Sequence, residues 1–126
     1  MSFSTDFRTL IIADASINAD VNGGIYWENL PENFSVEKNW IVYSFNNNEQ
    51  LTCLNGTPSF SRFNLVLKIL STDSIVLERI TNRVIDYLNS NSSGNIQDIS
   101  FSNWSPSLDL DKNIYINTLN FVVLSI

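Results

Sequence analysis

Alternating apolar and polar residues between Phe60 and Leu70 constrain the fold of this chain more than any other feature. One face of the segment is apolar and the other carries polar and basic side chains: Phe63, Leu65, Leu67 and Ile69 on the first, Arg62, Asn64 and Lys68 on the second, with Val66 as the exception. A repeat of two residues is typical of a β-strand with one face in the core. The segment therefore predicts a half-buried antiparallel strand.

The segment from Ile75 to Leu88 has a helical repeat and predicts the main helix. It follows a cluster of capping residues, Ser71 to Ser74, and its apolar stripe consists of Leu77, Ile80, Val84 and Leu88. Side chains three and four positions apart lie on one face of a helix, so this stripe is suited to cover a sheet.

The remaining segments follow an order that predicts an α+β fold. An N-terminal helix is expected from the apolar face of Phe3, Phe7, Leu10 and Ile11, and residues 13–21 repeat this pattern more weakly. Further strands are expected at 25–27, 40–45, 51–54, 96–104 and 114–126, with 40–45 apolar enough to be covered on both faces and 46–50 forming a polar turn. We expect one domain, residues 1–126, in which a mainly antiparallel sheet carries one long amphipathic helix on a face, plus the N-terminal helix.

The chain is acidic and has few charged residues, which bears on its partners. Charged residues make up 16% of the 126 residues, and the formal net charge is −6. Soluble domains average about 25% charged residues, and the cores of protein interfaces are depleted in charge, so the composition favours extensive contact with partners. The alternative explanation of this composition is the coding bias of an AT-rich genome. Such a bias would also raise the lysine content, and lysine is scarce here, so bias alone explains the composition incompletely. The negative charge argues against binding nucleic acid, because phosphate contacts need Lys and Arg; an acidic wall would let DNA pass without adhesion.

Few residues of this chain are suited to catalysis, and we expect no enzyme. The absence of histidine excludes Ser-His-Asp and Cys-His arrangements and removes the commonest metal ligand. Cys53 is the one cysteine, and no basic residue lies within eight positions of it, so a structural thiol is expected. A catalytic carboxylate pair drawn from Glu28, Glu32 and Glu37 is less expected than a solvated loop or an interface rim.

Two further motifs are too incomplete to predict a site. Residues 108–113, LDLDKN, resemble the beginning of a calcium loop, but Ile114 and Asn120 replace the glycine and the closing glutamate that the loop needs. Gly23 and Gly24 precede a strand, whereas a phosphate-binding loop precedes a helix. The tryptophans are expected mainly in the core, since Trp27 and Trp40 lie beside aliphatic strand residues, with stacking on bases or sugars as the alternative. We therefore predict no metal and no cofactor.

The N-terminal segment lacks the features of a signal peptide or a membrane span. MSFSTDFRTLIIADA has no basic region, and Asp14 interrupts its apolar run. A single cysteine is compatible with a reducing compartment.

A series of short motifs runs along nearly the whole chain. "LIIADASINADVNGGIYWENLPE", residues 10–32, is followed by "WIVYSF", by the long alternating strand "FSRFNLVLKIL" leading into a helix, and by a final pair of strands. This order resembles the tail-completion, or tail-terminator, proteins of long-tailed bacteriophages, which begin with a helix, a stretch like L-x-A-D-A-x-I-x-A-x-V, glycine, an I-Y strand and a loop with L-P. The resemblance covers roughly residues 8 to 125. Asn39 stands where the family often has proline, and the helix from Ser74 lacks the family's alanine-rich character.

The resemblance implies a structural protein of the virion, assembled in the host cytoplasm. Members of the family form a ring, typically a hexamer, at the head-proximal end of the tail tube. The ring ends tube polymerisation and joins the tail to the head connector, and DNA passes through its channel without specific binding. The implied partners are copies of the chain itself, the tail tube protein and the connector or adaptor proteins, with no membrane.

Two polar loops, residues 28–38 and 46–50, are the candidate subunit-interface or channel-facing segments. A ring requires two different surfaces of each subunit to meet, and six subunits would carry a net charge of −36 (6 × −6). An ordinary solvated side chain is the alternative at each position. The candidate residues are Glu28, Glu32, Glu37, Glu49, Asn47 and Asn48.

Other functions remain open at this point. Another neck component, such as a head-closure or head-tail adaptor protein, would differ in its position in the virion. A small cytoplasmic ligand-binding or antitoxin-like α+β module would be a stable monomer with a concave pocket and convergent polar groups. An enzyme would carry perturbed carboxylates in such a pocket.

Overall fold

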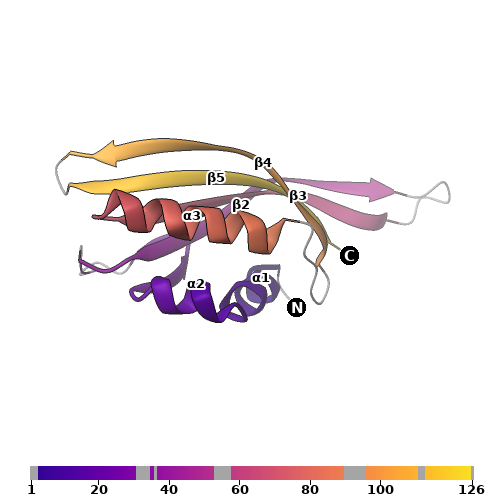
Figure 1. Ribbon diagram of the computed structural model, residues 1–126. Helices are drawn as coiled ribbons and strands as arrows, with labels where there is room; N and C mark the ends of the chain where they lie inside the picture. Colours follow the sequence, from indigo (N-terminus) through magenta and orange to yellow (C-terminus); the bar gives the residue numbers. More distant parts are fainter. Residues whose placement is uncertain are drawn as a thin grey trace.

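The computed structural model describes residues 3–30, 35, 37–52, 58–89, 96–110 and 113–125. Its elements follow the order α1 (Phe3–Ile12), α2 (Ala15–Asp20), β1 (Gly24–Trp27), β2 (Trp40–Thr52), β3 (Pro58–Ser71), α3 (Ser74–Leu88), β4 (Ile96–Asp109) and β5 (Ile114–Ser125). The three helices lie on the same side of a long, curved sheet (Figure 1). The predicted α+β fold is confirmed, with the long helix packed on one face of a mainly antiparallel sheet and a further helix at the N-terminus.

The sheet has five strands in the order β1-β2-β3-β5-β4. The short strand β1 runs parallel to β2, and all other neighbouring pairs are antiparallel. The β4–β5 connection lies at one end of the sheet, where Tyr115 pairs with Ser71. β2 ends and β3 begins at the other end of the sheet, where Thr52 pairs with Pro58 (Figure 1). The sheet therefore has two different edges, β1 and β4, and a hairpin connection at each end.

The predicted polar turn at residues 46–50 is wrong, because β2 continues through this segment. The pairing with β3 places Asn46 opposite Asn64 and Glu49 opposite Arg62, with a register shift between these two pairs. Asparagine has a low strand propensity, but pairing with a neighbouring strand overrides such local preferences. The shift places one extra residue on β2, as a β-bulge does, without ending the strand.

The other predicted elements are confirmed in kind but differ in length. The alternating segment 60–70 begins earlier, as part of β3, and the strand predicted at 96–104 continues as β4 to Asp109. The weaker helical pattern at 13–21 forms only the short α2. Of the brief strand predicted at 51–54, the first two residues belong to β2 and the others lie outside the described residues.

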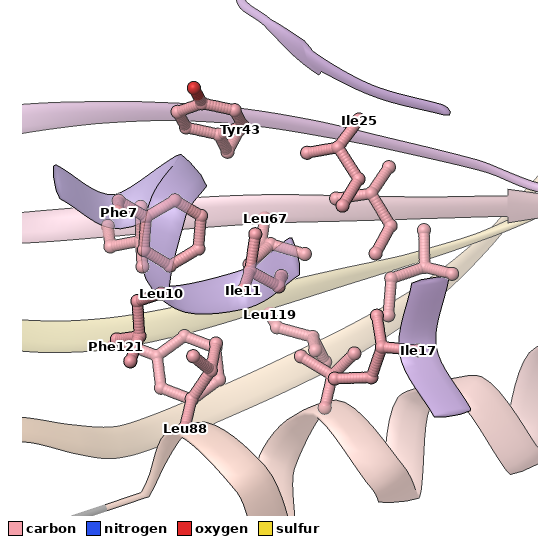
Figure 2. Close-up of a cluster of buried hydrophobic side chains, with 14 of the residues drawn as sticks. Phe7, Leu10, Ile11, Ile17, Ile25, Tyr43, Leu67, Leu88, Leu119 and Phe121 are labelled. Carbon is pink, nitrogen blue, oxygen red and sulfur yellow. The ribbon is translucent and has the colours of Figure 1, made fainter. Parts of the chain in front are cut away.

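The main core fills the space between the helices and the sheet. Figure 2 shows Phe7 of α1, Ile17 of α2 and Leu88 of α3 pointing toward Leu67 and Phe121 of the central strands. All five side chains are at most 1% exposed. The apolar stripe of α3 and the apolar face of β3 thus meet as the sequence predicts, because each buries its regular row of apolar side chains against the other.

The opposite face of the sheet, here called the open face, is covered by no helix among the described residues. A second, smaller cluster lies at its β1 end: Trp40, Leu70 and Ile114, with Tyr26, Leu30, Val42 and Ile116 packed against it. Farther along the open face, Arg62 and Lys68 are exposed and Ser44 is half-buried. The strand predicted at 40–45 therefore has apolar residues on both faces, but cover on the second face is limited to the Trp40 end.

Aspartate side chains cap the two helices that follow turns. Asp14 accepts hydrogen bonds from the backbone N–H groups of Ser16 and Ile17, at 2.8 and 3.1 Å. Asp73 does the same for two N–H groups in the first turn of α3, at 2.9 and 3.3 Å. The capping cluster predicted at 71–74 is confirmed, since these bonds satisfy donors that have no partner inside the helix.

Candidate assembly surfaces

The predicted acidic residues do not form a single site. Glu28 is exposed directly after β1, with φ 65°, and its backbone N–H donates to the Tyr43 carbonyl at 2.9 Å. Glu37 is exposed just before β2. The two strands are parallel, with Gly24 opposite Trp40, so Glu28 and Glu37 lie toward opposite ends of β1. This placement provides no carboxylate pair across a cleft.

The other predicted residues are described only in part. Glu32 and Cys53 lie outside the described residues. Asn47, Asn48 and Glu49 belong to β2, where only their backbone is described. Of the three, Glu49 has a register partner, Arg62, while Asn47 and Asn48 lie in the register shift, and the role of all three stays a prediction.

The described residues contain neither a metal cluster nor a membrane-spanning helix. No group of three or more Cys, Asp or Glu in these ranges is arranged to hold a metal ion. Over the same ranges, no helix has the length and apolar character needed to cross a membrane. In the segment similar to a calcium loop, Leu108 and Asp109 complete β4, Asn113 has φ 59°, and residues 111–112 lie outside the described ranges.

Two ion pairs and one hydrogen bond fix the small helices to α3. The Arg83 guanidinium donates to the buried Asp14 carboxylate at 2.7 Å, and Arg79 donates to Asp20 at 3.0 Å on the surface. The Tyr87 hydroxyl donates to the Leu10 carbonyl at 2.7 Å. Burial alone would raise the pKa of Asp14, but the backbone N–H groups and the Arg83 guanidinium stabilise its charged form and hold its pKa below the usual value.

Asp14→Asn is expected to lower the free energy of unfolding at neutral pH by ~1–2 kcal/mol, because asparagine still caps α2 but cannot form a charge-assisted bond with Arg83. The folded-state pKa is lowered, so this stabilisation is complete above the unfolded-state pKa and is lost as the pH falls through the folded-state pKa. Urea unfolding between neutral pH and pH ~2 should show the two proteins converging on acidification. Asp73→Asn, at a cap described without an ion pair, is the control. A wild-type advantage that persisted at the acidic end would contradict the role of this charge.

An exposed aromatic hollow lies between α3 and the outer strands of the sheet. It has a volume of about 280 Å³, and we call it the Trp104 hollow; its walls include Leu77, Glu78, Thr81, Trp104, Pro106 and Tyr115. Trp104 is 48% exposed and Tyr115 is 40% exposed. Its floor is polar but satisfied, since the Asn117 amide donates to the Thr81 hydroxyl at 2.9 Å. The hollow thus combines apolar walls with one nearby carboxylate.

A second exposed aromatic group lies at the β1 edge. Trp27 is 38% exposed, and its inner side packs on Tyr43 and Phe45, with ring centroids 5.3 and 4.5 Å apart. The exposed Arg8 lies beside this group, because its guanidinium donates to the Ile25 carbonyl and also bonds Tyr43. We call the exposed Trp27 and Arg8, together with the half-buried Phe45 and the buried Tyr43 that they contact, the Trp27 patch. It combines an apolar surface with a cation.

These two surfaces were missed by the sequence prediction, which placed the tryptophans mainly in the core. Trp40 fits that prediction, since it is 6% exposed and its indole N–H donates to the Ser35 carbonyl at 2.8 Å. Trp27 does not fit it, since it is 38% exposed. Trp104 is more exposed still, and here the sequence carries a signal: Trp104 stands in SNWSPS, where its neighbours two positions away are Ser102 and Pro106. A large aromatic residue with no apolar neighbours at strand spacing indicates an exposed face.

A second hollow, on the open face, is lined mainly by amides and aliphatic side chains. Its volume is about 400 Å³, and its walls include Asn64, Val66, Asn103, Asn120 and Val122. The Asn120 amide donates to the Asn103 side-chain carbonyl at 2.8 Å, so two of the three amides already bond each other. None of its lining residues is charged.

Comparisons with known proteins identify the fold. No protein-family model and no curated protein matches this sequence. Among solved structures, a chain of one described as "Virion of native gene transfer agent (GTA) particle" aligns with a TM-score of 0.74, over 98% of this chain and 94% of that chain. The sequence identity is 13%. This chain therefore shares its fold, over nearly its full length, with a chain of a gene transfer agent virion.

Proposed function

We propose that this chain is a structural virion protein that forms a homo-oligomeric ring, a hexamer, at the head-proximal end of a phage-like tail tube. The ring ends tube polymerisation and joins the tail to the head connector, and DNA passes through its channel. The observation that carries this proposal is the fold match with a chain of a gene transfer agent virion, since the match leaves almost none of either chain unaligned. The order of motifs along the sequence supports the tail-terminator position within such a particle.

The physical character of the surface is compatible with this role. A net charge of −6 per chain disfavours adhesion of DNA. Exposed aromatic residues occur at both edges of the sheet, on β1 and β4, which suits an assembly in which unlike surfaces meet. No reaction is part of the proposal, and the described acids Glu28 and Glu37 are assigned to the rim of a subunit contact.

Glu32, Asn47, Asn48 and Glu49 are proposed to face the channel or a subunit contact, and a substitution of Glu49 tests this. Its register partner Arg62 is exposed on the open face. If this part of the sheet faces DNA, Glu49→Lys should slow DNA ejection by about tenfold or more, since local charge changes association and passage steeply. Asp86→Lys, on the exposed side of α3, changes the net charge equally and is the control. Equal ejection rates for the two variants and the wild type would exclude a channel position for Glu49.

The tail-terminator role is tested by removing the protein during particle assembly. A protein that ends tube polymerisation should leave tubes of uncontrolled length when it is absent, without attached heads. A head-closure or adaptor protein should instead leave tails of normal length. Electron microscopy of the resulting particles separates these outcomes, and normal tails joined to heads would contradict every neck assignment.

A further inference from the structure

The two exposed aromatic surfaces lie at opposite edges of one sheet. The Trp27 patch is on the β1 side, and the Trp104 hollow is on the β4 side, with β2, β3 and β5 between them. No described strand pairs with the outer side of β4 between Ile96 and Leu108. One subunit cannot bring these two edges together, because the sheet is open.

We propose that the Trp104 hollow of one subunit receives the Trp27 patch of a second copy of this chain. The inference rests on the proposed ring and specifies its subunit contact. Trp27 is 38% exposed, so part of its ring is available for burial, and a hollow of about 280 Å³ with aromatic walls suits an aromatic side chain. Central aromatic anchors in pockets are the usual source of affinity in protein interfaces.

Charge complementarity identifies the occupant as a copy of the chain. The Trp27 patch has Arg8 beside its aromatic rings, and the Trp104 hollow has Glu78 in its wall. When the patch enters the hollow, this cation and this carboxylate come from different subunits and can pair. Glu28, directly after Trp27, lies at the rim of the contact and remains in solvent.

The strand directions are compatible with a ring whose axis runs along the strands. β1 is parallel to β2, and each later neighbour in the order β2-β3-β5-β4 is antiparallel to the one before it. The two edge strands, β1 and β4, therefore run in opposite directions. Rotation about an axis along the strands preserves these directions. The β4 edge of one subunit would therefore lie antiparallel to the β1 edge of the next. Because the two surfaces differ, the contact is of the kind that repeats around a ring.

Pro106 disfavours a contact in which the sheets of two subunits pair strand to strand, and so favours a contact made by side chains. It lies within the edge strand β4 and lacks a backbone N–H. Proline at an edge strand limits the addition of further strands, which otherwise leads to open-ended aggregation. The aromatic hollow beside it then selects one partner surface.

The proposal is tested by measuring ring assembly of purified full-length variants. Trp104→Ser and Trp27→Ser are each expected to raise the dissociation constant between subunits at least about 30-fold, the range of an interface hot spot. Trp104→Phe should retain most assembly. Ile75→Ser, which removes a more exposed apolar residue of α3 outside the hollow walls, should leave assembly unchanged. Circular dichroism and the urea midpoint check that each variant is folded.

Exchanging the charges of Arg8 and Glu78 gives a second, independent test of the contact. Arg8→Glu and Glu78→Arg should each weaken assembly, and the double variant should recover much of the loss, because the pair is restored with its signs reversed. If the wild type forms rings and the folded tryptophan variants form them equally well, this contact is wrong while the ring stands. If the wild type forms no ring on its own or on tails, the proposed function itself fails.

Discussion

Phe121→Ala is expected to lower the free energy of unfolding by ~3–5 kcal/mol. Phe121 lies on β5 near the middle of the sheet, is 1% exposed, and packs edge-to-face on Phe101 with ring centroids 5.5 Å apart. Figure 2 shows it pointing toward Leu88 of α3, so its removal leaves a cavity between helix and sheet. Equilibrium unfolding in urea, at one low protein concentration, measures the loss separately from assembly.

Val122→Ala is the matched control for this prediction. Val122 is the next residue of β5, lies on the open face and is only half-buried. Its truncation should lower the free energy of unfolding by ~1 kcal/mol or less. Similar losses for the two variants would mean that the helix-covered face is not the main core.

Gly23→Ala is expected to destabilise the fold by ~1–3 kcal/mol, through overpacking and not through backbone conformation. A Cβ atom at Gly23 would lie 2.5 Å from the Trp40 indole ring and 2.8 Å from the Asn39 carbonyl. The backbone has little room to move, because the Gly23 N–H donates to that same carbonyl at 2.8 Å. The contact begins the parallel β1–β2 pair, so the substitution also disturbs the β1 edge.

A double-mutant cycle tests this explanation. If the new methyl group collides with the indole, Trp40→Leu should cost less in the Gly23→Ala background than in the wild type. Additive losses would contradict the steric cause. Gly24 differs from Gly23, since its φ of 120° is a conformation that favours glycine.

The sequence predicts well those elements whose signal is local and regular. The alternation of 62–69 and the stripe of α3 specify both the elements and the faces that they bury, because burial of one regular row of side chains gives each its periodicity. The residues Asn46–Gln50 are predicted wrongly because their strand conformation depends on pairing with β3, and the local sequence pattern contains no information on that pairing. The length of β4 is missed for the same reason, since its second half is polar and is paired along β5.

The candidate surfaces are less predictable than the fold. Trp27 and Trp104 are far apart in the sequence, and only the strand order reveals that they mark opposite edges of the sheet. The acids Glu28 and Glu37 are close in sequence, yet the parallel pairing of β1 with β2 places them at different ends of a strand. Spacing along a chain does not predict neighbours across a sheet whose order is set by non-local pairing.

The central claim is that copies of this chain bind one another through two unlike surfaces and form a closed ring. Negative-stain electron microscopy of the purified protein, with its mass from light scattering, tests this most directly. We expect annular particles with an open centre and a mass near 86 kDa, six times 14.3 kDa. A uniform population of 14.3 kDa monomers, at high concentration and in the presence of purified tails, would contradict the claim.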